Sequence, residues 1–407
     1  MNPFTIETER FLILDGATGT ALANEGLPAG CSVEGWVLGH PEAIQRVQAG
    51  YVAAGSDVVY SCTFGGNGAR LKKFGMDCDV KKLNFELATL SKQVGASCVA
   101  GSVGPTGLMH VPYGATGQEE MLSLFRPQIE GLAEAGVDYI IIETMMDIRE
   151  ARAAVLAAKE VCRLPVAVTL TVEANGRTLS GTSLSTALVT LSALGVSAVG
   201  LNCSAGPAEM SAVLESAAQY AAVPMIAKPN AGLPETAEDG SVSFSMTPEV
   251  FASSLNLPGA VCMAGGCCGT GAGHIAALKK AMEGRKVSFT PCGTDGILTS
   301  HNQMVETGGT ITAQPLAAGA DMLDESFEPP YEEQEVLFIT AKEPGDVQEI
   351  EQFTGMVGKP LCFACDDAEV LEGILRRYPG RAGVEAACYD ANVSVCVRYG
   401  AQRIQIK

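Results

Sequence analysis

The sequence predicts a (β/α)8 barrel, the TIM-barrel fold, followed by a small C-terminal α/β domain. Short apolar runs alternate with helix-like segments from residue 10 to about residue 285. The runs are almost continuously apolar, as expected of parallel strands that are buried on both faces. Eight such repeats favour a closed barrel over a doubly wound open sheet, which rarely needs eight consecutive parallel units.

The expected strands are short and each is bounded by polar residues or glycine. In chain order they span residues 11–15, 57–62, 98–103, 138–143, 165–170, 198–203, 224–229 and 260–264. Stretches with apolar residues at helical spacing lie between them and predict helices, among them 41–55, 118–136 and 147–160. Pro127 should kink or break the second of these helices. The phrases A-G-S-D and A-G-V-D each end a helix with a glycine cap and begin the next strand.

The expected domain division has three parts. We expect the barrel to occupy residues 1–290, a connector to span 291–335, and a small α/β domain to span 336–407. The acidic stretch 321–335 contains Pro-Pro, which is typical of an extended and solvated segment. Strand and helix patterns resume at residue 336, but too few of them remain to close a second barrel.

Composition narrows the classes of function. The chain of 407 residues has a net charge of −19, which argues against nucleic acid and against anionic membranes as partners. It contains no apolar run long enough to span a bilayer. The N-terminus lacks the order of a signal peptide, so a cytoplasmic location is expected. The 14 cysteines are therefore expected to be reduced, most of them packing as small hydrophobes.

Polar and thiol residues gather where the expected strands end. In a (β/α)8 barrel, the carboxyl ends of the strands surround the active site. A strand that only packs has no need of such residues, so this concentration indicates a site. The residues concerned are Asp15, Cys62, Glu143, Asn202, Cys203, Asn230 and the segment 265–268, which reads G-G-C-C.

Three of these residues form a candidate metal site. Cys203 ends the sixth strand, and Cys267 and Cys268 end the eighth, so all three should reach the same mouth of the barrel. Three protein ligands with an open fourth position are typical of a catalytic zinc. The neighbouring glycines 265, 266 and 269 allow the sharp turn that two adjacent ligands require.

Two other interpretations of these cysteines stay open at this point. They could be packing residues, or the adjacent pair could be a redox dithiol, although neighbouring cysteines make a poor disulfide. The separate pair Cys362 and Cys365 has redox spacing, but it lies within or at the end of a strand. We therefore expect Cys362 and Cys365 to belong to the core.

Six motifs together make the chain similar to a known family. They are L-D-G-A-T-G-T-A-L (14–22), G-S-V-G-P-T-G (101–107), I-I-E-T (141–144), G-L-N-C-S (200–204), P-N-A-G-L-P (229–234) and G-G-C-C-G-T (265–270). In this order they resemble the homocysteine S-methyltransferase family, most closely the N-terminal homocysteine-binding module of cobalamin-dependent methionine synthases. The resemblance covers roughly residues 5–290 and implies a (β/α)8 barrel with Zn²⁺ held by three cysteines.

The resemblance also implies a reaction and a substrate. Zinc held by Cys203, Cys267 and Cys268 would bind the homocysteine thiol as a thiolate, which attacks an electrophilic methyl group and yields methionine. The expected substrate-binding residues fall into three groups. Asp15 and Glu143 would bind the ammonium group, the backbone of Gly16, Ala17 and Thr18 would bind the carboxylate, and Asn202 and Asn230 would complete the site.

Local alternatives exist for several of these residues. Asp15 could instead be a helix N-cap and Glu143 a buried ion-pair partner. Asn230 could occupy the fourth zinc position before the substrate arrives, or be an ordinary turn asparagine.

The methyl donor is not determined by these motifs. We expect methylcobalamin carried by a separate corrinoid protein, with a sulfonium compound such as S-methylmethionine as the alternative. Betaine fits less well, because its recognition usually needs an aromatic cage and the chain has only one tryptophan. The expected partners are thus homocysteine and a corrinoid or other methyl-donor protein, and a homo-oligomer is compatible with the sequence. Other functions considered are a non-catalytic zinc or homocysteine-binding subunit and a thiol oxidoreductase.

Overall fold

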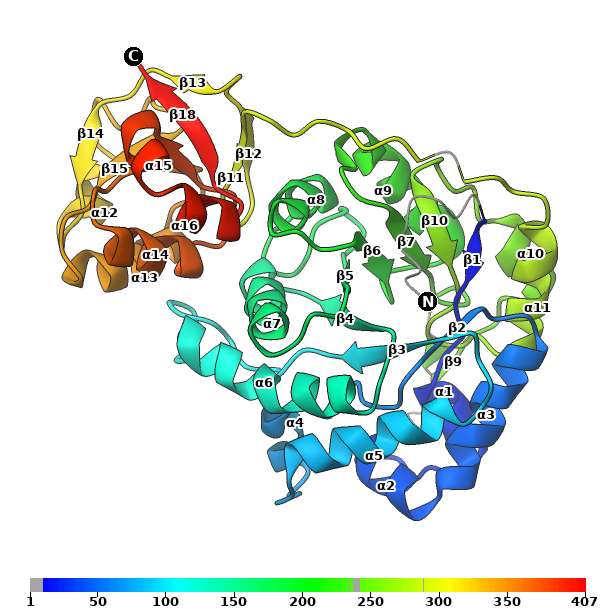
Figure 1. Cartoon of the computed structure of the whole chain (residues 1–407). Helices are drawn as coiled ribbons and strands as arrows, with labels where there is room; N and C mark the ends of the chain where they lie inside the picture. Colours follow the sequence, from blue (N-terminus) through cyan, green and yellow to red (C-terminus); the bar gives the residue numbers. More distant parts are fainter. Residues whose placement is uncertain (1–9, 234, 237–241, 288) are drawn as a thin grey trace.

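The computed structural model describes residues 10–233, 235–236, 242–287 and 289–407. Within these ranges, eight parallel strands form a sheet that curls into a barrel, in the order β1-β10-β7-β6-β5-β4-β3-β2 (Figure 1). A parallel bridge between Leu14 and Val58 joins the first strand to the second and closes the ring. The predicted TIM-barrel fold is confirmed. Its strands are β1 (Leu12–Ile13), β2 (Val58–Tyr60), β3 (Cys98–Val103), β4 (Tyr139–Met145), β5 (Val166–Leu170), β6 (Ala198–Asn202), β7 (Met225–Lys228) and β10 (Val261–Ala264).

Helices surround the barrel, and side chains cap the first turn of several of them. Asp147 accepts a hydrogen bond from the backbone N–H of Arg149, and Ser183 accepts one from that of Thr186. The long helix α6 continues through Pro127, so this residue does not end it. The helices are α1 (Gly19–Asn24), α2 (Val33–Gly39), α3 (Pro41–Ala53), α4 (Gly68–Lys73), α5 (Val80–Lys92), α6 (Gln118–Glu134), α7 (Ile148–Val161), α8 (Leu184–Ala193), α9 (Pro207–Ala217), α10 (Pro248–Ser253) and α11 (Ala272–Ala281). A short turn η1 (Ala218–Tyr220) and the hairpin of β8 (Glu235–Thr236) and β9 (Val242–Ser243) complete this half.

Alternate residues of each strand face opposite sides of the sheet. In β4, Ile141 belongs to the cluster that fills the barrel, whereas Ile140 and Ile142 belong to the layer between strands and helices. Both layers exclude water, which explains why the strands are apolar along their whole length.

A second unit, residues 297–407, follows the barrel, and we call it the C-terminal unit. It contains an open, fully parallel sheet in the order β13-β18-β17-β16-β15-β14. The range 291–335, which the sequence indicates as a connector, holds β11 to β14 and α12. The elements are β11 (Ile297–Thr299), β12 (Met304–Glu306), β13 (Thr310–Ile311), β14 (Pro315–Ala317), α12 (Met322–Glu325), β15 (Leu337–Thr340), α13 (Gly345–Met356), β16 (Leu361–Ala364), α14 (Ala368–Arg377), β17 (Gly383–Glu385), α15 (Ala386–Ala391), α16 (Val393–Arg398) and β18 (Gln402–Ile406).

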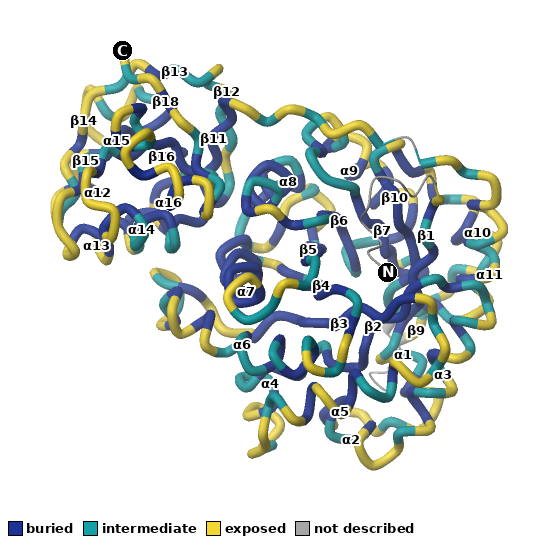
Figure 2. Tube along the Cα trace, in the orientation of Figure 1, coloured by how far each residue is buried: buried dark blue, intermediate teal, exposed yellow. Residues whose placement is uncertain are grey.

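The C-terminal unit packs beside helices α6, α7 and α8 of the barrel (Figure 1). Figure 2 shows α7 largely buried, unlike the outer helices on the opposite side. Arg152 on α7 donates a hydrogen bond of 3.1 Å to the backbone oxygen of Leu375, and Arg376 pairs with Glu160 at 2.7 Å. Among the helices in the described ranges, none combines the length and the apolar character that crossing a membrane requires.

Candidate metal and substrate site

The three predicted cysteines meet at the carboxyl ends of β6 and β10. Their sulfur atoms all lie within 4.8 Å of one another, and the Sγ atoms of Cys203 and Cys268 are 3.5 Å apart. The backbone N–H of Cys203 donates to the oxygen of Lys228 (3.1 Å), and that of Cys267 donates to the oxygen of Pro229 (2.7 Å). Both cysteine-bearing segments are thus tied to the end of β7, the strand between them, and this brings the thiols together.

Unusual backbone conformations aim the sulfurs at one point. Cys203 has a φ of 55°, a left-handed conformation that residues other than glycine seldom adopt. Gly269, directly after the cysteine pair, has a φ of 80°. Gly266 serves a different need, because a Cβ atom there would lie 2.3 Å from the hydroxyl oxygen of Thr270. The glycines predicted to allow the turn therefore act in two ways, one through its φ angle and the other through its lack of a side chain.

The donor set fits zinc. Thiolates bind Zn²⁺ at about 2.3 Å in a tetrahedron, which places neighbouring sulfurs about 3.8 Å apart. The three thiols already approach this spacing, and they leave a fourth position open. In the part of the chain that the structure describes, no other group of three His, Cys, Asp or Glu residues is arranged to hold a metal.

The thiols also differ in acidity. The pKa of Cys268 is lowered, because the thiols of Cys203 and Cys267 donate hydrogen bonds to its sulfur.

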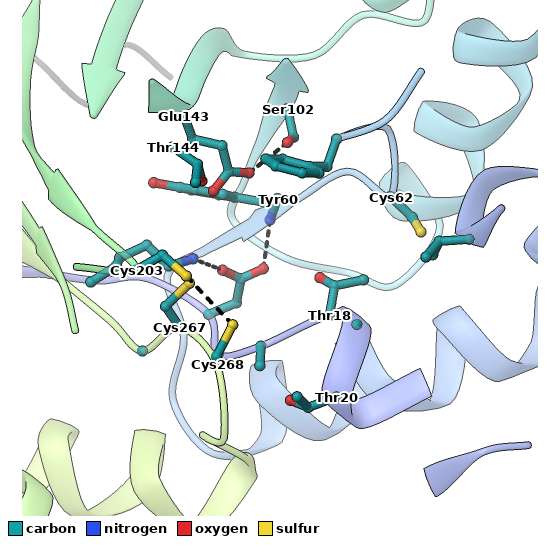
Figure 3. Close-up of a pocket in the computed structure, with 18 of the residues that line it drawn as sticks. Thr18, Thr20, Tyr60, Cys62, Ser102, Glu143, Thr144, Cys203, Cys267 and Cys268 are labelled. Atoms are coloured by element: carbon teal, nitrogen blue, oxygen red, sulfur yellow. Dashed lines mark hydrogen bonds and ion pairs between the residues drawn. The ribbon is translucent and has the colours of Figure 1, made fainter. Parts of the chain in front are cut away.

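The cysteines open onto a cavity of about 280 Å³ inside the barrel mouth. Figure 3 shows the three sulfurs on one side and Glu143, Thr144, Ser102 and Tyr60 on the other. The cavity walls also include Asp15, Lys228 and the segment Gly16–Thr18. Soft metal ligands and buried charged groups thus share one enclosed space.

Asp15 is engaged in a buried ion pair. Its Oδ1 atom lies 2.5 Å from the Nζ atom of Lys228, and its Oδ2 atom accepts a hydrogen bond of 2.7 Å from the backbone N–H of Tyr60. The Lys228 ammonium also lies over the ring of Tyr60, 3.7 Å from its centre. Burial raises the pKa of Asp15, and the charge of Lys228 and the N–H of Tyr60 act against that rise. Asp15 is not a helix cap.

Glu143 has no cationic partner among the described residues. Its carboxylate accepts a hydrogen bond of 2.6 Å from the hydroxyl of Ser102 and one of 3.2 Å from the side-chain amide of Asn202. Burial raises the pKa of Glu143 to about 7, although the nearby charge of Lys228 and the Ser102 hydrogen bond act in the opposite direction. An uncompensated carboxyl that is buried in this way is a suitable partner for a substrate ammonium.

Asn202 is fully buried and lies behind the cavity wall. Its side-chain oxygen accepts hydrogen bonds from the Thr144 backbone N–H and the Thr169 hydroxyl, each 2.9 Å long. Its amide nitrogen donates to Glu143 and, at 2.7 Å, to the Thr144 hydroxyl. Thr144 has a φ of 63°, so Asn202 stabilises the strained backbone next to Glu143. Asn202 therefore orients Glu143 rather than lining the cavity itself.

The remaining predicted residues lie at or near the cavity. Gly16, Ala17 and Thr18 line it, but the Ala17 N–H is already bonded to the Thr270 hydroxyl at 3.2 Å. Asn230 is buried beside the cysteine segments and does not line the cavity, and its Oδ1 atom has no hydrogen-bond partner in the described part of the chain.

The distant cysteine pair lies in the C-terminal unit. Cys362 and Cys365 are buried there, in the core position that the sequence predicts.

Sequence reasoning missed Lys228, Tyr60 and Ser102. All three lie among the last three residues of predicted strands, so the rule that strand ends form the site could have found them if it had been applied to more than the final residue. Lys228 was the strongest missed signal, because a lysine that ends an apolar strand inside a barrel needs a buried partner.

The family described as homocysteine S-methyltransferase matches residues 12–282. The chain belongs to this family. The match covers the whole barrel and all three cysteines.

Two curated relatives are named methionine synthase. The protein of Mycobacterium tuberculosis is 30% identical over 314 residues, covering 70% of this chain and 26% of the relative. That of Mycobacterium leprae is 30% identical over 299 residues, covering 67% of this chain and 24% of the relative. The chain thus spans about a quarter of the length of these relatives.

Solved structures of a family member share the barrel. The metallated form of the homocysteine methyltransferase MmuM from Escherichia coli is 25% identical, with a TM-score of 0.56, covering 69% of this chain and 99% of that chain. Its oxidized form, with a TM-score of 0.57 and 24% identity, covers the same shares. Both matches leave out about a third of this chain.

Proposed function

We propose that this protein transfers a methyl group to the sulfur of homocysteine and so forms methionine, with zinc held by Cys203, Cys267 and Cys268. The observation that carries the proposal is the meeting of three thiols and an uncompensated carboxylate, Glu143, in one cavity. The thiols suit a metal that binds the substrate sulfur, and the carboxylate suits the ammonium group of an amino acid. Family membership supports the same reaction.

Each residue has a separate task in this scheme. Zinc on three thiolates supplies a Lewis acid that keeps a fourth sulfur ligand deprotonated and nucleophilic at neutral pH. Glu143 accepts a hydrogen bond from the substrate ammonium, and Asn202 and Ser102 fix the direction of its carboxylate. The cavity walls exclude water from the substrate sulfur. The sulfur loses its proton, forms a bond to the methyl carbon, and the donor leaves with the electron pair of the broken bond.

The proposed donor is methylcobalamin presented by a separate corrinoid protein. The names of the relatives, methionine synthase, support the product but do not specify the donor. A sulfonium compound such as S-methylmethionine is the alternative. Asn230, with its unpartnered and buried Oδ1 atom, is proposed to complete the metal site before homocysteine arrives.

The test is an assay of the zinc-loaded full chain with homocysteine and, in separate reactions, free methylcobalamin, S-methylmethionine or betaine. We expect methionine from at least one donor, detected by mass spectrometry, and none from the Cys267→Ala variant. If zinc is bound and homocysteine binds but no donor gives methionine, the chain is instead a substrate-binding subunit. Activity that survives removal of zinc would contradict the proposal.

A further inference from the structure

Lys228 is the one cation among the cavity-lining residues that the structure describes. It ends β7, between the strands that carry the cysteines, and its side chain is only 4% exposed. A buried ammonium group requires partners for its charge and for its three N–H bonds.

Two of those partners belong to the protein. The Asp15 carboxylate lies 2.5 Å from Nζ, and the Tyr60 ring faces the ammonium at 3.7 Å. In the described ranges, no further hydrogen-bond acceptor contacts Nζ. Since Lys228 lines the cavity, its remaining donor is available to a molecule bound there.

Of the carboxylates that line the cavity, Asp15 and Glu143 differ in their partners. Both oxygens of Asp15 are occupied, one by Lys228 and the other by the Tyr60 N–H. Glu143 receives hydrogen bonds only from the uncharged groups of Ser102 and Asn202. The third carboxylate that lines the cavity, Glu34, accepts hydrogen bonds from the backbone N–H of Gly65 (2.6 Å) and the hydroxyl of Ser32 (3.1 Å). At the Lys228 side, the cavity thus offers a carboxylate without a cationic partner, Glu143, and a cation with a free donor.

That pairing matches the two charges of an α-amino acid. We propose that Lys228 determines substrate specificity by binding the carboxylate of the incoming amino acid, while Glu143 alone binds its ammonium group. Asp15 acts through Lys228: it holds the lysine in place and compensates its charge, and it does not contact the substrate. This assignment rests on the proposed function and changes the role expected for Asp15.

The alternative carboxylate site is weaker. The segment Gly16–Thr18 was expected to bind this group through its backbone N–H groups, but the N–H of Ala17 is already bonded to Thr270. A charged donor in a buried site also binds a carboxylate more strongly than a neutral amide does.

The test compares three thiols by calorimetric titration of the zinc-loaded full chain: homocysteine, homocysteamine, which lacks the carboxylate, and γ-mercaptobutyrate, which lacks the amino group. We expect the wild type to bind homocysteine at least about tenfold more tightly than homocysteamine, the factor that one such contact commonly gives. Lys228→Met should reduce that preference to about twofold or less. Glu143→Gln should instead reduce the preference for homocysteine over γ-mercaptobutyrate.

Two further variants make the outcome unambiguous. Lys279→Met removes an exposed lysine of α11 and should leave both preferences unchanged. Asp15→Asn/Lys228→Met removes both buried charges, so it provides a folded protein if Lys228→Met alone is unstable, and it should show the same loss of preference.

The possible results separate the two proposals. If the variants bind zinc and homocysteine but keep the wild-type preference over homocysteamine, the role of Lys228 is wrong and the proposed function stands. A wild type that binds homocysteamine as tightly as homocysteine would also overturn that role. If the zinc-loaded wild type binds none of the three thiols, the proposed function fails, and this inference with it.

Discussion

The sulfur atoms of Cys203 and Cys268 lie 3.5 Å apart, although 65 residues separate them in the chain. Parallel strands bring them together, because every carboxyl end of such a barrel points to the same mouth. Backbone hydrogen bonds from both cysteine-bearing segments to the end of β7 then fix the distance between the two segments. The metal site is thus a property of the barrel, and no single loop contains it.

Replacing Cys203 with alanine should abolish stoichiometric zinc binding. Two thiols from neighbouring residues remain, which is one ligand fewer than zinc sites in enzymes normally have. The zinc content after dialysis, measured by elemental analysis, should fall from about one zinc per chain to well below half of that. Cys292→Ala is the matched control, because this half-buried thiol lies outside the cluster. Full zinc content in Cys203→Ala would show that the three thiols do not form the site.

Gly269→Ala should also reduce zinc binding, although it removes no ligand. The new Cβ atom would lie 2.3 Å from Cγ of Phe244, on a backbone with a φ of 80°. Relief of this clash must shift Cys268, and we expect a loss of about 1–3 kcal/mol in the free energy of unfolding. Gly273→Ala is the control, since its Cβ would meet Pro248 at an ordinary 3.4 Å. A Gly269→Ala protein with normal zinc content and stability would contradict this account of the turn.

The dependence of activity on pH should report the protonation of the Glu143 carboxyl. Burial raises the pKa of this carboxyl to about 7, with Lys228 acting against the rise and with Cys267 and Asp15 adding to it. The carboxylate form is the one that accepts the substrate ammonium, so kcat/KM for homocysteine should fall as the pH drops below about 7. The ammonium stabilises that form, and kcat at saturation should therefore fall only at a lower pH.

Glu143→Gln provides the control for this pH profile. The amide cannot titrate, so its kcat/KM should be low and should lack the fall near neutral pH. If the variant keeps the wild-type profile, another group is responsible for it.

The barrel strands and the cysteine site could be predicted because each is indicated by a short stretch of neighbouring residues in the sequence. In a strand such as β4, residues 139–142 are buried whichever face of the sheet they point to, so all four are apolar or aromatic. The cysteines and Glu143 stand at strand ends, where packing alone would favour apolar residues.

Other features depend on contacts that the sequence pattern does not encode. The partner of Asp15 is Lys228, more than 200 residues away. A lysine in an apolar strand indicates that a buried partner exists, but no local pattern indicates that this partner is Asp15. The strands Thr310–Ile311 and Pro315–Ala317 are too short to show periodicity, so their range looked like a connector. Each of them pairs with a longer strand, β18 or β15, and this pairing exists only in the folded protein.

The ion pair between Asp15 and Lys228 should show strong coupling in stability. The side chains are 1% and 4% exposed, so removing either partner leaves the other buried and unpaired. Asp15→Asn and Lys228→Met should each lower the free energy of unfolding by about 3 kcal/mol. The double variant should lose less than the sum of the two single losses. Chemical denaturation of the metal-free proteins measures this, and additive losses would show that the pair is not coupled.

The C-terminal unit should be required for the stability of the barrel. Every residue of α7 from Ile148 to Ala158 is buried, whereas an outer helix of a barrel normally exposes a polar face. The C-terminal unit covers this helix, and its Arg376 pairs with Glu119 and Glu160 on the barrel. A fragment of residues 1–290 should therefore expose an apolar surface, bind a hydrophobic dye and unfold at a lower temperature than the full chain.

Arg376→Glu tests the same interface in the intact chain. It places a negative charge against Glu119 and Glu160, which are partly exposed, so the expected loss is about 1 kcal/mol. The loss should shrink at high salt, because screening weakens repulsion between exposed charges. Arg403→Glu is the matched control: it reverses the charge of one partner in an exposed pair with Asp390, inside the C-terminal unit, and should leave the contact of this unit with the barrel unchanged. If Arg376→Glu and the fragment both behave like the full wild-type chain, the C-terminal unit does not stabilise the barrel, and the burial of α7 has another cause.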